Sequence, residues 1–197
     1  MISALIPTKD SERLLVHTLS SLVSASAEGI LKEVVVADGG STDNSAIVAD
    51  ASGADWIESG NDAGSALCAG VEACKRGDWV LVIKPGAILQ TDWQNEAVGF
   101  IERASRTRQQ GTIVGVYSYR SEEFGVLARV KQTLIGLKHA MWKTTCYDLP
   151  FLVQKKYLQS CLARAPMLSV NAQLQKILRA SRVHWLNSTV VFQRNES

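Results

Sequence analysis

The chain has 197 residues, of which 46% are hydrophobic and 20% are charged, and its net charge is +2. This composition is typical of a globular protein with a sizeable core, and the small net charge gives no reason to expect a nucleic-acid partner. The four cysteines show neither C-x-x-C spacing nor a disulfide framework, and no apolar run is long enough to span a bilayer, so we expect a soluble, cytoplasmic protein without a transmembrane segment.

Strands and helices are predicted to alternate through the first 90 residues. Short apolar runs that stop at Gly, Pro or Asp predict strands, and amphipathic segments between them predict helices. This alternation predicts a parallel α/β sheet with right-handed crossovers. The predicted strands are Ile2–Ile6, Leu31–Ala37, Asp55–Glu58 and Trp79–Ile83, and the predicted helices are one capped by Asp10 or Ser11, one around Ala46–Ala51 and one over Ala63–Lys75.

The pattern changes after residue 90. A long amphipathic helix is predicted over Val126–Lys143, and its apolar stripe with flanking basic residues has two interpretations. It packs on the sheet, which we favour, or it lies on an anionic membrane surface at the inner face of the membrane. The other predicted elements are a helix after Thr91, a strand over Thr112–Tyr119, a strand over Phe151–Val153, helices over Lys155–Ala163 and Ser169–Ala180, and strands near Val183–Leu186 and Thr189–Phe192.

The segment VVVADGGSTDNS, Val34 to Ser45, is the most informative stretch. A buried strand stops at Asp38-Gly39-Gly40, where two glycines permit the positive φ of a tight turn. Ser41 or Thr42 is predicted to cap the next helix, with Asp43 in its first turn. Ligands bind at the carboxyl ends of parallel strands, so we interpret Asp38 as the anchor of a nucleotide site. The alternative is an ordinary turn with a solvated Asp and a Ser/Thr cap.

Other strand ends carry candidate ligand groups that a parallel sheet would bring to the same edge. The sequence has no G-x-G-x-x-G or P-loop after a strand and no G-x-S-x-G elbow, and its histidines stand alone, so dinucleotide, P-loop, hydrolase and zinc sites are disfavoured. A receiver-type domain with Asp38 as phosphate acceptor is also disfavoured, because Pro7-Thr8 stands where an acidic pair is needed. The candidate groups are Pro7-Thr8, Asp10, Asp38 to Asp43, Asp62 to Gly64, and Lys84 to Gly86.

In order and spacing, three segments, together with a capped Asp92-Trp93 region, resemble family 2 glycosyltransferases with the GT-A fold, in particular the small, soluble bacterial members. They are IPTKDSERLL at Ile6–Leu15, VVVADGGSTDNS at Val34–Ser45, and DAGSALCAGVEACKRGDWVLV at Asp62–Val82. The resemblance implies a single domain over 1–197, with a nucleotide-binding, mostly parallel but mixed sheet flanked by helices. It further implies a nucleotide-binding half at 1–90 and an acceptor half at 91–197.

The family binds a nucleotide-diphosphate sugar and transfers the sugar to an acceptor. By this resemblance Pro7 and Thr8 would line the nucleoside, while Asp38 would hold the base or ribose. Glycines would let the backbone approach the ligand closely. The full set of implied nucleotide-binding residues is Pro7, Thr8, Asp10, Asp38, Gly39, Gly40, Ser41, Asp43 and Gly64.

The sequence departs from the family at its metal motif. The family ends its fourth core strand with D-x-D, whose last Asp holds a divalent cation, whereas this chain has Lys84-Pro85-Gly86-Ala87. We therefore predict no metal ligand here and no required cofactor; the alternative is a Mg²⁺ or Mn²⁺ ion, as the family uses, held in an unusual way. Lys84 could place an ammonium where the metal would be and stabilise the departing diphosphate. The alternative is a solvated turn lysine.

The second departure concerns the catalytic base. The family carries an acidic pair at the start of a late helix, but the matching stretch here, Met167–Asn171, has no acid. Asp148 is the nearest carboxylate and our candidate base; its alternative is a turn residue before Leu149-Pro150. The sequence thus predicts either a transferase acting on an unknown acceptor, for which a lipid-linked molecule is one candidate, or a nucleotide-binding protein that has lost transfer activity.

Overall fold

The computed structural model describes residues 1–59, 63–106, 112–119, 148–164 and 168–193. Within these ranges eight strands form one sheet in the order β3-β2-β1-β4-β7-β6-β8-β5. The strands are β1 (Ile2–Thr8), β2 (Leu31–Asp38), β3 (Asp55–Glu58), β4 (Trp79–Val82), β5 (Ala87–Leu89), β6 (Ile113–Tyr119), β7 (Phe151–Gln154) and β8 (Arg182–Phe192). The helices are α1 (Glu12–Ala27), α2 (Ser45–Ala51), α3 (Ala63–Ala73), α4 (Trp93–Arg106), α6 (Lys155–Ala163) and α7 (Val170–Ala180).

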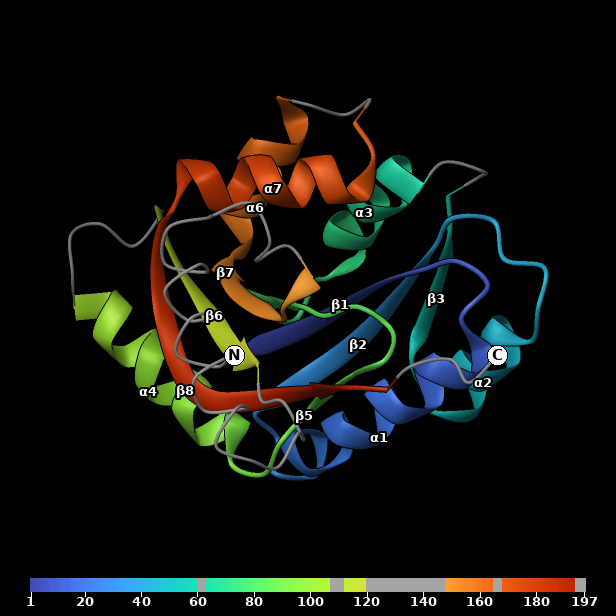
Figure 1. Cartoon of the computed structure of the whole chain (residues 1–197), viewed down its shortest axis with the longest axis horizontal. Helices are drawn as coiled ribbons and strands as arrows, with labels where there is room; N and C mark the ends of the chain where they lie inside the picture. Colours follow the sequence, from blue (N-terminus) through green and yellow to red (C-terminus); the bar gives the residue numbers. More distant parts are fainter. Residues whose placement is uncertain (60–62, 107–111, 120–147, 165–167, 194–197) are drawn as a thin grey trace, which may run out of the picture.

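The sheet is mixed. Strands β3, β2, β1 and β4 run parallel to one another, as the alternation of strands and helices predicts. Strand β7 is antiparallel to both β4 and β6, whereas β6 and β8 are parallel. The curled sheet continues from the first half of the chain into the second without a break (Figure 1). This architecture confirms the predicted α/β fold with a mostly parallel but mixed sheet.

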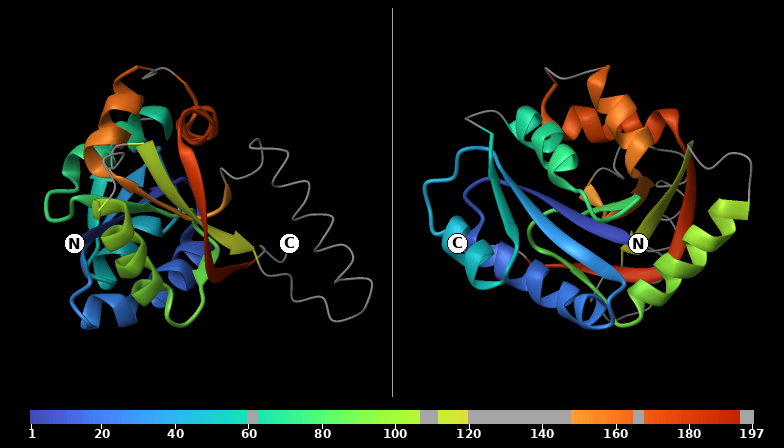
Figure 2. Two further views of the ribbon diagram at one scale, coloured as in Figure 1. Left: turned by 90° about the vertical axis from the view of Figure 1, so that its left-hand side faces the viewer. Right: turned by 180° about the vertical axis from the view of Figure 1, so that it is seen from behind.

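Helices cover the sheet from both sides. Helices α3, α6 and α7 lie above it in Figure 1, and α1, α2 and α4 lie below it; the view from behind shows the same two groups (Figure 2, right). Strands β1 and β4 are buried along their whole length, since helices or neighbouring strands cover them on every side. Helix α3 lies close to β1 and β2 because Gly70 has no side chain: a Cβ there would be 2.5 Å from Leu5 Cδ1 and 2.7 Å from Ala37 Cβ.

The C-terminal strand differs from the prediction. The sequence predicts two strands, but β8 is one strand of 11 residues. Its register against β6 shifts at Asn187 and Ser188, and the backbone N–H groups of both residues donate to the carboxylate of Glu96 on α4. Burial would raise the pKa of Glu96, but the hydrogen bonds from the Ser188 side chain and from both N–H groups, with the charge of Arg103, outweigh burial and hold the pKa below its usual value. Asn187 and Ser188, which suggested a break between two strands, therefore form a β-bulge within β8 that hydrogen bonds to α4 stabilise.

Strand β5 and the start of α2 also differ from the prediction. Lys84-Pro85-Gly86 forms the expected turn, with Gly86 at φ 88°, but the chain then pairs with β8 as the short strand β5. Helix α2 starts at Ser45 with Asn44 at the N-cap position. The expectation that Ser41 or Thr42 caps this helix, with Asp43 inside its first turn, is therefore wrong.

The long amphipathic helix predicted over 126–143 lies outside the described residues. Among the helices of the described ranges, none has the length and apolar character needed to cross a membrane.

Candidate functional site

The ends of three parallel strands meet at one edge of the sheet. Thr8 lies opposite Asp38 in the β1–β2 register, and the N–H of Gly39 donates to the carbonyl of Thr8 at 2.9 Å. At the end of β4, the N–H of Ile83 donates to the carbonyl of Leu5 on β1 at 3.0 Å, and Lys84 follows. The predicted groups at Thr8, Asp38 and Lys84 therefore lie along a common rim. Gly64 lies in the first turn of α3, and Asp62 is outside the described residues.

The carboxylate of Asp38 is bound by its own loop. Its oxygens accept hydrogen bonds from the N–H of Gly40 at 3.0 Å, from the N–H of Ser41 at 2.9 Å and from the hydroxyl of Ser41 at 2.5 Å. The residue is only 4% exposed, and Gly40 adopts φ 89°. This geometry fits the turn interpretation of Asp38. Contact between Asp38 and a nucleoside stays a prediction.

The loop after β1 and the loop after β2 bind each other. Asp10 has a φ of 45°, and its carboxylate accepts from the N–H of Thr42 at 2.8 Å, while its own N–H donates to the hydroxyl of Ser41 at 2.9 Å. An Asp tolerates this left-handed conformation when local hydrogen bonds hold it. We call residues 9–12 and 39–45 the loop pair. Within the loop pair, the carboxylates of Asp10 and Asp43 each accept a hydrogen bond from a backbone N–H group of the other loop.

Asp43 lies between two helix N-termini. Its carboxylate accepts from the N–H of Glu12, the first residue of α1, at 2.9 Å and from the N–H of Ser45, the first residue of α2, at 3.1 Å. Burial would raise the pKa of Asp43, but the hydrogen bonds from Ser45 and Glu12 outweigh burial and lower the pKa. One carboxylate thus satisfies N–H groups at the start of both helices.

A pocket of about 360 Å³ opens beside this rim. Its lining brings together the end of β1, the turn after β4 and the N-terminus of α7. The hydroxyl of Thr8 is buried and has no hydrogen-bond partner among the residues that the structure describes. The lining residues are Pro7, Thr8, Lys9, Ser11, Ala66, Lys84, Pro85, Ser169, Val170 and Asn171. Of the predicted nucleotide-binding residues, Pro7 and Thr8 line this pocket, whereas Asp38, Ser41 and Asp43 belong to the adjoining loops.

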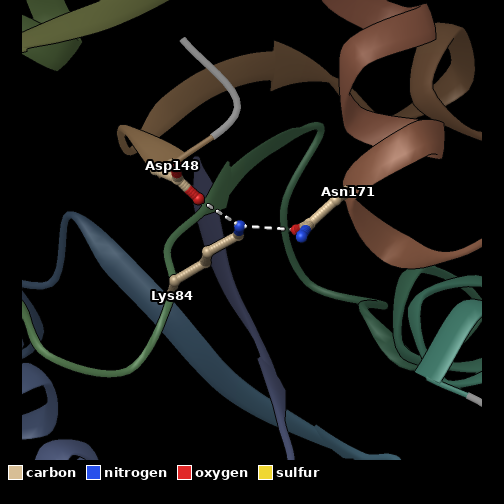
Figure 3. A network of polar contacts seen from close by, with 3 residues as sticks. All are labelled: Lys84, Asp148 and Asn171. Atoms are coloured by element: carbon tan, nitrogen blue, oxygen red, sulfur yellow. Dashed lines mark hydrogen bonds and ion pairs between the residues drawn. The ribbon is translucent and has the colours of Figure 1, made fainter. Parts of the chain in front are cut away.

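Three side chains from distant parts of the sequence converge on one another (Figure 3), and two of them, Lys84 and Asn171, line the pocket. The ammonium of Lys84 lies 2.6 Å from Asp148 Oδ1 and 2.7 Å from Asn171 Oδ1. Lys84 follows β4, Asp148 precedes β7, and Asn171 is in the first turn of α7. The sequence points to both Lys84 and Asp148 as candidates. It does not point to Asn171, because an Asn at a helix start carries no local sign of a partner 87 residues away.

The residues at the end of β4 do not fit a divalent cation. The Lys84 ammonium lies between the two oxygens that a cation would use, and its positive charge opposes a second cation beside it. Elsewhere in the described ranges, no three His, Cys, Asp or Glu side chains come together as metal ligands.

A mixed sheet whose polar loops and pocket gather at the carboxyl ends of β1, β2 and β4 defines an α/β protein of the GT-A type. The profile of the family described as glycosyl transferase family 2 matches residues 3–159. The chain therefore belongs to this family of glycosyltransferases. No curated protein sequence matches the chain.

Solved structures of glucosyl-3-phosphoglycerate synthase from Mycobacterium tuberculosis share the fold. The complex with Mn²⁺, uridine diphosphate and phosphoglyceric acid is 17% identical, covers 99% of this chain and 71% of that chain, and has a TM-score of 0.64. The complex with Mg²⁺ and uridine diphosphate is 18% identical, covers 99% and 72%, and has a TM-score of 0.63. The complex with Mn²⁺ and uridine-diphosphate-glucose is 18% identical with the same coverage and a TM-score of 0.57.

Proposed function

We propose that the chain binds a nucleotide-diphosphate sugar at the rim of β1, β2 and β4 and transfers the sugar to an acceptor. Membership of glycosyl transferase family 2 supports the reaction class. The observation that carries the proposal for this chain is the pocket beside that rim, because Lys9 and Lys84 give it positive charge suited to a diphosphate. In this proposal residues 1–90 supply most of the nucleotide contacts, the start of α7 adds one wall of the pocket, and residues 91–197 otherwise bind the acceptor.

Lys84 is proposed to stabilise the leaving group. Departure of a nucleoside diphosphate develops negative charge, which a nearby ammonium can stabilise in place of a metal ion. The position of Lys84 at the end of β4, between two oxygens, supports this role. The proposed nucleoside contacts are the backbone of Pro7 and Thr8 and the turn at Asp38–Ser41.

A second candidate is a binding protein without transfer activity, and one observation favours it. A general base must reach the acceptor hydroxyl, yet α7 has no acidic residue in its first turn, and the carboxylate of Asp148 contacts Lys84. Asp148 as the base therefore stays a prediction. A lipid-linked acceptor presented by residues 126–143 stays a prediction as well.

A thermal-shift panel tests the proposed binding. Uridine, guanosine and adenosine diphosphates and their glucose conjugates are each added with Mn²⁺ or with EDTA. A ligand that binds only the folded chain, at a hundred times its Kd, adds about 2.7 kcal/mol and raises the Tm by several degrees. At least one nucleotide should do so, and the matching nucleotide sugar should then be hydrolysed slowly without acceptor. Binding without turnover would favour the second candidate, and no shift with any nucleotide would contradict both.

A further inference from the structure

The N-terminus of α7 forms one wall of the pocket and is suited to an anion. The helix has 11 residues, no acidic residue in its first turn, and no side-chain cap hydrogen bond from Ser169 at the N-cap position. Ser169, Val170 and Asn171 all line the pocket. The backbone N–H groups at a helix start and the helix dipole attract a negatively charged group. Two further residues of the lining are cationic: Lys9, and Lys84, whose charge is paired with the carboxylate of Asp148.

The hydroxyl of Thr8 independently points to a ligand. Thr8 lines the pocket and is only 4% exposed, and its Oγ1 has no hydrogen-bond partner among the described residues. A buried hydroxyl without a partner is unfavourable, because it has lost its hydrogen bonds to water without replacement. A ligand oxygen in the pocket would accept this hydrogen bond. The carboxylate of Asp38, which lies beside Thr8 in the register, does not, because it is bound to its own loop.

Asp148 is positioned as an exchangeable partner of Lys84. The side chain of Lys84 is 21% exposed, whereas that of Asp148 is 52% exposed. A half-exposed carboxylate regains its hydration when it leaves an ion pair, so this contact costs little to open. Lys84 would keep the oxygen of Asn171 when Asp148 leaves.

We propose that a phosphate-type anion enters this pocket, replaces the carboxylate of Asp148 on the ammonium of Lys84, and is held without a divalent cation. Its ligands are Lys84, the hydroxyl of Thr8 and the N-terminus of α7. The inference rests on the proposed function, because a nucleoside diphosphate is the expected source of the anion. A phosphorylated acceptor has the same chemistry and is the other source.

Opposite effects of two substitutions test the exchange. Binding of pyrophosphate to the full chain is measured by calorimetry in EDTA. Lys84→Met should weaken binding at least about tenfold, since it removes a charge-assisted contact. Asp148→Asn should strengthen binding by up to about fivefold, since it removes the competing carboxylate. Lys176→Met, which changes an exposed lysine on the same helix as Asn171, is the matched control and should leave binding unchanged.

Thr8→Val is the second test, because it removes the hydroxyl with little change in shape and should also weaken binding. Equal binding by wild type and Lys84→Met, weaker binding by Asp148→Asn, or binding that needs Mn²⁺ would each overturn the inference.

Uridine diphosphate and 3-phosphoglycerate identify the source, since the true source should displace pyrophosphate. Uridine diphosphate that binds only with Mn²⁺ would overturn the inference and leave the proposed function standing. If pyrophosphate binds with the expected variant pattern but no nucleotide binds, the anion site stands and the proposed function is contradicted.

Discussion

At the scale of single residues, Asp43 has the clearest structural role at the rim. Neither Ser11 nor Asn44, at the N-cap positions of α1 and α2, makes a side-chain cap hydrogen bond. The carboxylate of Asp43 accepts from the first N–H group of each helix instead. A negative charge at a helix N-terminus is favourable, and here one charge serves two helices. Asp43 therefore fixes the position of the two loops of the loop pair relative to each other.

Asp43→Asn should destabilise the fold by about 1 kcal/mol, the usual cost of losing a helix cap. The pKa of Asp43 is lowered in the folded state, so its carboxylate contributes stability above the unfolded value of 3.8, and this contribution is lost as the pH falls through the folded value. In urea, the free energy of unfolding of the wild type should exceed that of Asp43→Asn at about pH 6. This difference should narrow at about pH 2.5. Asp50→Asn, an exposed change on α2, is the control. An equal difference in the free energy of unfolding at both pH values would contradict this role.

The sequence indicates which residues occupy the rim but not what each side chain contacts. Asp38, Asp43 and Lys84 follow strands and so belong at the carboxyl edge of the sheet. Whether a carboxylate faces a ligand or a neighbouring loop depends on which strands are adjacent, and spacing along the chain does not contain that information. The contact of Lys84 with Asn171 joins positions 87 residues apart, so only the folded chain brings it about.

At the scale of elements, Gly70 sets how closely α3 lies on the sheet. The nearest atoms to an added Cβ are the end of the Leu5 side chain and the Cβ of Ala37, and the latter is fixed to the backbone of β2. Glycine normally weakens a helix relative to alanine. At this position the close approach of α3 to β1 and β2 outweighs that cost.

Gly70→Ala should therefore destabilise the protein by about 1–3 kcal/mol, because overpacking outweighs the gain in helix propensity. Gly99→Ala on α4 is the matched control, since its Cβ would meet only the flexible end of Arg103 at 3.3 Å. That substitution should be neutral or stabilising by up to about 1 kcal/mol. Thermal unfolding of both variants measures the contrast. A Gly70→Ala protein as stable as the control would show that α3 can move away from the sheet at little cost.

Elements formed by local pattern are easier to predict than those formed by distant pairing. The apolar runs of β1, β2 and β4 and the amphipathic pattern of α1 agree with the structure to within a few residues. Strand β5 is not predicted, because three residues after a turn carry no periodic signal and β5 is a strand only through its pairing with β8. The bulge at Asn187 and Ser188 resembles a loop in the sequence, because its partner, Glu96, lies on a helix far away along the chain.

At the scale of the whole molecule, one sheet joins the two halves of the chain. Strand β4 pairs with β1 on one side and with β7 on the other, and α3 contacts α6 and α7 as well as the first three strands. Residues 1–90 without their partners would expose the edge of β4 and one face of α3. Exposed strand edges and apolar helix faces disfavour independent folding.

The intact chain should unfold in a single transition, with tryptophan fluorescence and far-UV circular dichroism coinciding in urea. A fragment of residues 1–90 should not form the native sheet, so hydrogen exchange should find the amides of β1 and β4 protected in the full chain and unprotected in the fragment. Protected strands in the isolated fragment would instead show that the proposed nucleotide-binding half folds by itself.

The reciprocal hydrogen bonding of the loop pair also bears on how this chain can diverge. Thr42 donates to Asp10, Glu12 donates to Asp43, and Asn44 donates to the carboxylate of Glu12, so each loop completes the other. A substitution in one loop removes a hydrogen-bond partner from the other loop. Positions 10, 12 and 42–44 should consequently covary among descendants of this sequence, and grafting one loop alone into another scaffold should fail where grafting both together succeeds.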